Sequence, residues 1–264
     1  MRWLGFELPE LRAGVCEDAR VLLENCGTAA WRGGERGTVR LSYHWLDELG
    51  NPIVWDGPRT RLRLVEPGEE FELAFPLRSP IPPGRYRLAI DLVDEGRCWF
   101  AELGNGPLEV AVRVGPRLRR RALAVRIEGQ AGEPTERALA GQDEALVAEE
   151  EAEAIAYLAP ECLPRSDWSS HVLDAHNEGY AIVAGSIDIR SGLLRRRPTG
   201  LSPWAPGVGR VPSFARPLLC PSVVKDLEPE WVDPVFGLPA VNRPRDEPWL
   251  YDGSIELRVH TLAR

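Results

Sequence analysis

Seven short segments fill most of the first 115 residues, and their spacing is the feature that most constrains the fold. Each segment alternates apolar and polar residues, or groups β-branched and aromatic ones, over the length of a strand. Turn signals separate them, among them "EPGE" at 66–69, "IPPG" at 81–84 and "GNGP" at 104–107. About seven strands at a spacing of roughly 8 to 12 residues are typical of an immunoglobulin-like sandwich. The predicted strands are 19–27, 37–48, 60–65, 69–78, 84–96, 98–103 and 108–114.

The pattern changes near residue 116, where a helix-prone, glutamate-rich stretch and later a long segment rich in proline and glycine replace the short strands. We therefore expect two domains, an immunoglobulin-like antiparallel β-sandwich over 1–115 and a mixed α+β region over 116–264 packed against it. The chain as a whole is predicted to be mainly β, with a few helices and a long proline-rich wrapping loop. The second region is predicted to contain helix within 133–161, a helix at 167–178 capped by Ser166 or Asp167, the loop at 198–248, and strands at 179–189 and 253–262.

Composition excludes several classes of function. The formal net charge of -8 disfavours nucleic acid and anionic membrane surfaces as partners. Lys225 is the single lysine and no glycine run precedes it, so there is no phosphate-binding loop of the GxxxxGK type. No stretch reaches the ~18 apolar residues of a membrane helix. The five cysteines are odd in number and widely spaced, which favours reduced thiols in a cytoplasm over a metal site or a disulfide framework.

Several runs of the N-terminal region carry a family resemblance, namely "LSYHWLDELGNPIVWDGPRTRL", "PGEEFEL" and "IPPGRYRLAIDLVDEGRCWFAELGNGPLEVAVRV". Over about residues 20–115 the chain resembles sandwich modules associated with bacterial glycosyltransferases and the carbohydrate-binding domains of polysaccharide-export ABC transporters. The segment "HVLDAHNEGYAIVAGSIDI" at 171–189 is similar to a helix-to-strand piece of family-2-like glycosyltransferases. Those enzymes bring a DxD motif for a metal-bound sugar diphosphate, and this chain has none. The resemblance implies association with glycan assembly.

Aromatic and polar residues that gather in two places indicate a candidate binding rim. Sugars bind by stacking on exposed aromatic rings while carboxylates, amides and arginine contact their hydroxyls. Trp99 and Phe100 have a second interpretation, in which they close the bottom of the sandwich core. The candidate ligand-binding residues are Trp55, Asp56, Arg59, Asp94, Arg97, Trp99 and Asn105.

Other clusters are interpreted as structural. His171 and Asp174 share a helix face but His176 points away, which does not give the geometry of a metal site on one helix. The arginine triplets 119–121 and 195–197 are expected to form a solvated surface or an ion-pair seam with the acidic stretch at 144–153, although guanidinium groups also suit phosphates. Trp204 and Trp231 are expected to anchor the proline-rich loop, with a binding lid as the alternative.

These observations lead to one functional hypothesis and two alternatives. The chain is expected to be a non-catalytic carbohydrate-binding or glycan-assembly module whose partner is a glycan or a glycan-assembly protein, without cofactor, metal, nucleic acid or membrane insertion. The first alternative is a scaffold, including a homo-oligomer, that acts through sheet edges and the tryptophan-rich loop. The second is a reduced glycosyltransferase-like enzyme.

Overall fold

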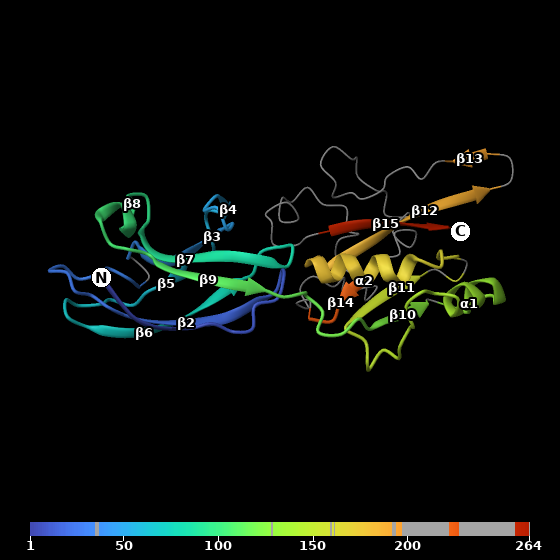
Figure 1. Ribbon diagram of the computed structural model, residues 1–264, viewed down its shortest axis with the longest axis horizontal. Helices are drawn as coiled ribbons and strands as arrows, with labels where there is room; N and C mark the ends of the chain where they lie inside the picture. Colours follow the sequence, from blue (N-terminus) through green and yellow to red (C-terminus); the bar gives the residue numbers. More distant parts are fainter. Residues whose placement is uncertain are drawn as a thin grey trace. The chain divides into compact units, whose positions relative to one another are not determined.

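The computed structural model describes residues 1–34, 37–127, 129–158, 160, 162–191, 194–196, 222–226 and 257–263. The chain divides into two compact units, Met1–Pro116 and Arg117–Arg264. Strands outweigh helices in the described residues, so the protein is mainly β (Figure 1).

The first unit is a sandwich of two antiparallel sheets. The smaller sheet has the order β1-β2-β6, and in the larger sheet the path β4-β3-β7-β8 is extended by β5 beside β3 and β9 beside β7. The two sheets face each other and enclose one apolar core, which is the arrangement of immunoglobulin-like domains. The strands are β1 (Arg2–Glu7), β2 (Cys16–Glu24), β3 (Val39–Leu46), β4 (Pro52–Val54), β5 (Thr60–Arg61), β6 (Glu70–Arg78), β7 (Gly84–Asp94), β8 (Cys98–Trp99) and β9 (Leu108–Val114).

Two core aromatics carry hallmarks of this fold. Trp45 on β3 is 1% exposed and lies in the centre of the core, as does the buried Tyr86 on β7. The Tyr86 hydroxyl donates to the carbonyl of Pro82 at 2.5 Å, which is the tyrosine corner of immunoglobulin-like sandwiches. In antibody domains the second cysteine of the inter-sheet disulfide stands two residues later, and here that position is the fully buried Leu88.

Three expectations for this unit need correction. Residues 98–103 form the short strand β8 followed by the 3-10 helix η1 (Phe100–Leu103), because the Asp91 carboxylate accepts the backbone N–H of Ala101 and bends the chain there. The strand expected over 60–65 is a strand only at Thr60–Arg61, and Val65 forms an isolated antiparallel bridge with Trp31. The first strand, β1, was missed, because a register shift between Trp3 and Gly5 interrupts its alternation.

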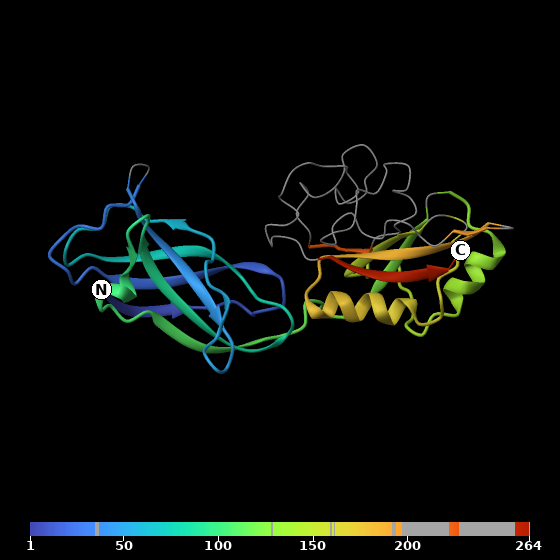
Figure 2. The same cartoon turned by 90° about the horizontal axis from the view of Figure 1, so that it is seen from above.

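The second unit is built on a mixed sheet with the order β10-β11-β14-β12-β13, and β15 also pairs with β12 (Figure 2). The pairs β10–β11 and β12–β15 are parallel, and the other three are antiparallel. Apolar residues of α2, among them Trp168, Val172 and Leu173, pack with β10, β11, β12 and β14 in a second core. The elements are β10 (Leu123–Ile127), α1 (Glu133–Ala140), β11 (Ala154–Leu158), α2 (Trp168–Glu178), β12 (Ile182–Ser191), β13 (Leu194–Arg196), β14 (Ser222–Val224) and β15 (Leu257–Ala263).

The expectation of helix through 133–161 is wrong beyond residue 140. The acidic stretch is irregular, and residues 154–158 form β11, in which Ala154, Ala156 and Leu158 alternate into the core. Tertiary packing thus overrides the helix propensity of an alanine- and glutamate-rich sequence. Most of the proline-rich segment 198–248, with Trp204 and Trp231, lies outside the described residues, and the described part contains β14.

Candidate ligand-binding site

The candidate site lies on the outward face of the larger sheet of the sandwich. Tyr43 and Trp45 of β3 belong to the core, so strand alternation sends Ser42 and His44 to the opposite face. Both of these polar residues are nevertheless buried, with His44 7% exposed. Another part of the chain therefore covers this part of the sheet.

The covering segment is 55–59, which follows β4. Gly57 holds it close to the sheet, because its N–H donates to the carbonyl of Tyr43 at 3.0 Å and its carbonyl accepts the Ser42 hydroxyl at 2.8 Å. A Cβ atom at position 57 would lie 2.8 Å from Tyr43. The approach therefore requires glycine, and it places Trp55 over β3.

The side-chain rings of two tryptophans contact His44. Its imidazole is stacked with the indole of Trp55 (centroids 4.4 Å apart, planes at 27°) and contacts the ring of Trp99 on β8 (4.3 Å). The Nδ1–H of His44 donates to the carbonyl of Trp55, and burial lowers the pKa of His44 below its usual value. Trp55 remains 58% exposed, so its outer ring face is open to a ligand. We call His44, Trp55, Trp99 and the adjacent Arg59 the aromatic cluster.

Arg59 fixes the cluster to its acidic neighbours. Its guanidinium lies 4.8 Å from the centroid of Trp99 and donates to the Ser42 hydroxyl at 2.7 Å. It also pairs with Asp56 at 2.5 Å and with Glu95 at 2.7 Å. One arginine thus connects β3, the covering segment and the turn after β7, which holds the two tryptophans in fixed orientations.

A buried carboxylate supports the same face from β7. Asp91, which is 1% exposed and opposite Ser42 in the strand register, accepts the N–H groups of Leu92 at 2.8 Å and Ala101 at 2.9 Å. Burial raises the pKa of Asp91 to about 6. Asp91 thereby holds η1, and with it Trp99, in place.

The structure brings together four of the seven residues that the sequence singles out, Trp55, Asp56, Arg59 and Trp99. Phe100 enters the core against Trp31, and Trp99 stays outside it with His44, so the two neighbours have different roles. The sequence interpretation missed His44 and Ser42, because their burial depends on a segment that folds back over the strand. The only sequence signal was the position of His44 between two core aromatics.

The other three predicted residues make contacts of their own. Arg97 and Asp94 form an ion pair at 2.9 Å across the β7–β8 turn, and Asp94 also accepts the Thr38 hydroxyl. Asn105 accepts the α-amino group of Met1 at 2.7 Å and donates to the carbonyl of Phe100 at 3.1 Å. The contacts of Asn105 therefore join the N-terminus to η1.

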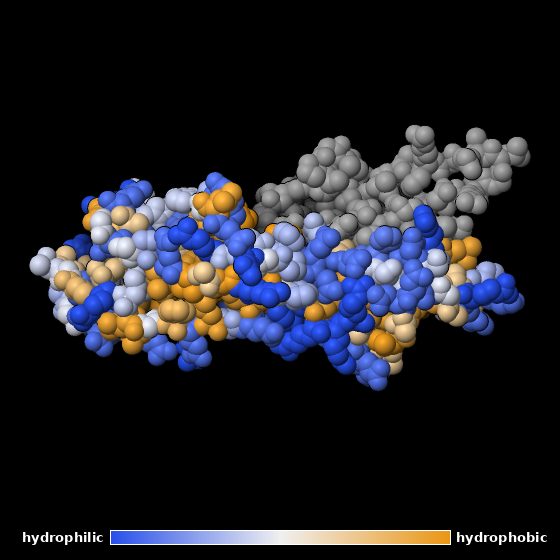
Figure 3. All heavy atoms as spheres, viewed as in Figure 1, coloured by the Kyte–Doolittle hydropathy of each residue, from blue (hydrophilic) through white to orange (hydrophobic). Residues whose placement is uncertain are grey.

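Large apolar side chains are also exposed on the hairpin that precedes Trp55 in the chain. Leu49, Ile53 and Val54, on and beside the β3–β4 hairpin, are 87%, 45% and 37% exposed. In the space-filling view hydrophobic atoms gather over β4 (Figure 3). The hairpin thus presents an apolar surface.

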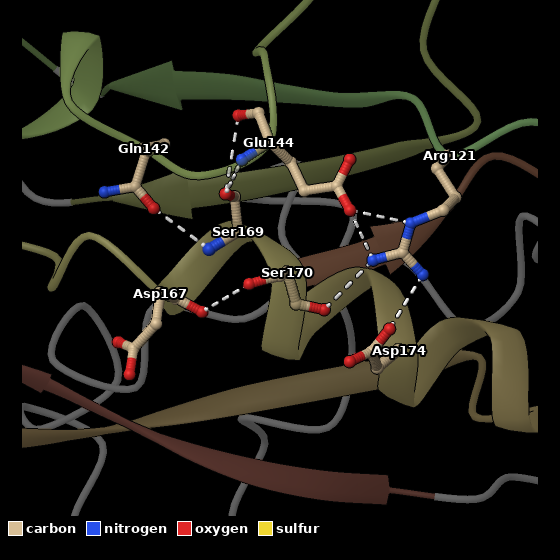
Figure 4. A network of polar contacts seen from close by, with 7 residues as sticks. All are labelled: Arg121, Gln142, Glu144, Asp167, Ser169, Ser170 and Asp174. Carbon is tan, nitrogen blue, oxygen red and sulfur yellow. Dashed lines mark hydrogen bonds and ion pairs between the residues drawn. The ribbon is translucent and has the colours of Figure 1, made fainter.

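The polar residues of the second unit form a structural network (Figure 4). Arg121 binds Glu144 at 2.6 Å and Asp174 at 2.7 Å, while Arg120 lies 3.6 Å from Glu153. This is the ion-pair seam expected for the first arginine triplet. Of the second triplet, Arg197 lies outside the described residues, as do the side chains of Arg195 and Arg196.

Helix α2 begins in an unexpected way. Asp167 stands at its N-cap position but its side chain makes no capping hydrogen bond. Instead, Gln142 Oε1 accepts the N–H of Ser169 at 2.9 Å (Figure 4). Gln142 Nε2 also donates to the carbonyls of Ala138 and Arg165. Asp167 is thus the N-cap residue, one of the two that were expected, but a side chain from a distant loop supplies the capping hydrogen bond.

The histidines of α2 have different surroundings. His176 is fully buried, with Nδ1 against the carbonyl of Tyr180 at 2.7 Å and Nε2 against the Ser222 hydroxyl at 2.9 Å, so it connects α2 to β14. The exposed His171 lies 3.5 Å from Asp167.

Across the described part of the chain, no three residues of the types His, Cys, Asp and Glu are grouped as a metal site would require. Within the same residues no helix has both the length and the apolar character to cross a bilayer.

Comparisons with known proteins give only distant likenesses. No family model matches the chain, and neither does any curated protein. A CARDB domain from Pyrococcus furiosus is 18% identical over 41% of this chain and 83% of its own, with a TM-score of 0.28. Beta-glucosidase 3B from Thermotoga neapolitana, in complex with glucose, is 16% identical over 43% of this chain and 15% of its own (TM-score 0.28). A family 123 glycoside hydrolase from Clostridium perfringens is 11% identical over 67% and 33% (TM-score 0.25). All three TM-scores lie far below 0.5, so these proteins say nothing about what this chain binds.

Proposed function

We propose that the protein is a non-catalytic glycan-binding module and that the aromatic cluster is its binding platform. The observation that carries the proposal is the setting of Trp55, whose indole is held flat against His44 while more than half of its surface stays exposed. A ring fixed in this way loses little conformational entropy when a ligand stacks on it. Exposed aromatic side chains without such support are usually mobile.

The polar groups of the cluster complete the recognition chemistry. The C–H face of a pyranose would stack on Trp55, and the carboxylates of Asp56 and Glu95 would accept hydrogen bonds from its hydroxyl groups. Both carboxylates are already oriented by Arg59, so they require little ordering on binding. The platform is open on its outer side, which leaves part of a polar ligand in water and keeps the affinity modest.

A glycan array probed with the full chain tests the proposal. Trp55→Ala is expected to abolish binding while the protein remains folded, because this side chain is mostly solvated. Leu49→Ala, which removes another exposed apolar side chain from the same hairpin region, is the matched control and should bind as the parent does. Silence of the parent on the array, or equal binding by Trp55→Ala, would overturn the proposal.

A scaffold function is the second candidate, and the exposed hairpin favours it. Leu49, Ile53 and Val54 lie on or beside the edge strand β4, and exposed apolar edge strands pair with other chains. Sedimentation velocity from about 1 to 100 μM should then show self-association that Ile53→Glu removes. A monomer over this range would exclude a homo-oligomeric scaffold.

We also propose a cytoplasmic location, which the free thiols of Cys26 and Cys98 support.

A further inference from the structure

Arginine stands directly opposite arginine at two places on the outward face of the larger sheet. Arg40 of β3 pairs in register with Arg61 of β5, and Arg85 of β7 pairs with Arg113 of β9. Like charges opposite each other on neighbouring strands destabilise a sheet. A nearby acidic side chain usually neutralises such a pair. Where no carboxylate does so, the two guanidinium groups remain available to bind an anion.

Among the described residues, no acidic side chain forms an ion pair with either arginine pair. Arg61, Arg85 and Arg113 form no ion pair there, and the guanidinium of Arg40 donates only to the carbonyl of Val39. By contrast, Arg87 on the same face is neutralised by Glu109, as Arg59 is by Asp56 and Glu95. The uncompensated positive charge is therefore concentrated in the two opposed pairs.

The two pairs lie at opposite ends of the aromatic cluster. Along β3, Arg40 precedes His44 by four residues, which is about 13 Å of strand. Along β7, Arg85 precedes Ala89, the register partner of His44, by the same number of residues. A ligand chain stacked on Trp55 and running along the strands would thus meet a pair of guanidinium groups at either end.

On the other face of the sandwich, carboxylates outnumber arginines at the outward strand positions. The outward positions of β2 and β6 carry Asp18, Glu24, Glu70 and Glu72, and Glu24 stands opposite Glu70 in the register. Arg20 is paired there with Glu72 and Arg2 with Glu24, whereas Arg78 of β6 donates to the carbonyl of Gly14. Among the described residues of this sandwich, arginine thus stands opposite arginine on the face that holds the aromatic cluster, in a protein whose net charge is -8.

We propose that the ligand of this face is an acidic saccharide whose carboxylate, sulfate or phosphate groups are bound by the Arg40–Arg61 and Arg85–Arg113 pairs. Planar guanidinium groups bind such oxyanions with two parallel hydrogen bonds, and two of them on neighbouring strands can share one anion. The inference rests on the proposed glycan-binding function, since the aromatic cluster supplies the stacking surface between the two pairs.

Matched neutral and acidic polysaccharides provide the test. The probes are dextran and dextran sulfate, and polygalacturonate and its methyl ester, titrated against the full chain by calorimetry at fixed ionic strength. The parent should bind the acidic member of each set at least about tenfold more tightly, the effect of one well-placed charge-assisted contact. The double variants Arg85→Gln/Arg113→Gln and Arg40→Gln/Arg61→Gln should each lose most of that preference and keep the affinity for the neutral member. Arg20→Gln, on the other face, is the control for charge alone and should retain the preference.

Each outcome separates the inference from the function on which it rests. Equal affinity for neutral and acidic members, lost in Trp55→Ala, would overturn the acidic preference and leave the glycan-binding function intact. A preference that survives both double variants, or that Arg20→Gln reduces as much, would show nonspecific charge attraction and also overturn it. Absence of binding to every probe and every array glycan would overturn both. Retention of dextran sulfate but not polygalacturonate would assign the pairs to sulfate or phosphate esters instead of carboxylates.

Discussion

His44 lies beneath Trp55, its ring 4.4 Å from the indole and its Nδ1–H bonded to the Trp55 carbonyl. Because burial lowers the pKa of His44, the unfolded chain takes up a proton near pH 6.5 that the folded chain resists. The contribution of His44 to the free energy of unfolding is therefore present at pH 7.5 and declines as the pH falls through 6.5. Urea unfolding of the parent and of His44→Phe, at pH 7.5 and 5.5, measures it. The parent should lose more stability than the variant on acidification, and parallel losses would contradict the prediction.

Asp91 should show the opposite dependence on pH. Its pKa is raised to about 6, so the folded chain binds a proton that the unfolded chain has already released. The stabilisation is complete below pH 4 and is lost as the pH rises through about 6. The loss amounts to about 3 kcal/mol at roughly 1.4 kcal/mol per pKa unit. Asp91→Asn should lack this decline, so the difference in free energy of unfolding between parent and variant should change by about this amount between pH 4 and pH 7. Asp47→Asn is the control, because hydrogen bonds from Asn51 lower the pKa of Asp47 and its removal changes the slope in the other direction.

The capping of α2 by Gln142 predicts which substitution loosens the helix. Gln142→Ala removes an acceptor for Ser169 N–H and two donors, and should cost about 1 to 2 kcal/mol. Asp167→Ala removes only partly exposed ion pairs with Arg165 and His171, and should cost less than about 0.5 kcal/mol. Hydrogen exchange of the amides in the first turn of α2 reports both changes locally. Faster exchange in Asp167→Ala than in Gln142→Ala would show that the helix is capped differently.

The opposed arginines predict a conflict between stability and binding. Arg113→Glu replaces a repulsive cross-strand pair with an ion pair to Arg85, and should raise the free energy of unfolding by about 0.5 to 1 kcal/mol. The same variant should bind acidic polysaccharides more weakly than the parent, since it adds a negative charge where the oxyanion is expected. Thermal unfolding and calorimetry on one preparation test both statements. A variant that is less stable than the parent would show that Arg113 has a favourable partner.

The strands that alternate cleanly were predictable from the sequence. In β2, β3, β6, β7 and β9 the inward residues are large and apolar, so the pattern alone identifies the core face. The failures occur where a distant contact decides the local structure. Asp91 creates η1 from ten residues upstream, and β11 forms because Ala154 and Ala156 meet strands on both sides.

The candidate site was predictable to the extent that its residues are neighbours in sequence. Trp55, Asp56 and Arg59 lie within five positions, and Trp99 was singled out as part of a second group of aromatic and polar residues. His44 was not predictable as their centre, because its partners come from two other segments. The arginine pairs escaped notice because each is defined by register, which appears only once strands are paired.

The cap on α2 also bears on the order of events during synthesis. An isolated helix of 11 residues is too short to persist in water, so α2 needs its tertiary contacts to form. Translation proceeds from the N-terminus, and Gln142 therefore leaves the ribosome 27 residues before Ser169. The loop that carries the side-chain amide of Gln142 is thus synthesised before the helix that it caps. Once a nascent chain extends past Gly179, it contains both residues of this hydrogen bond.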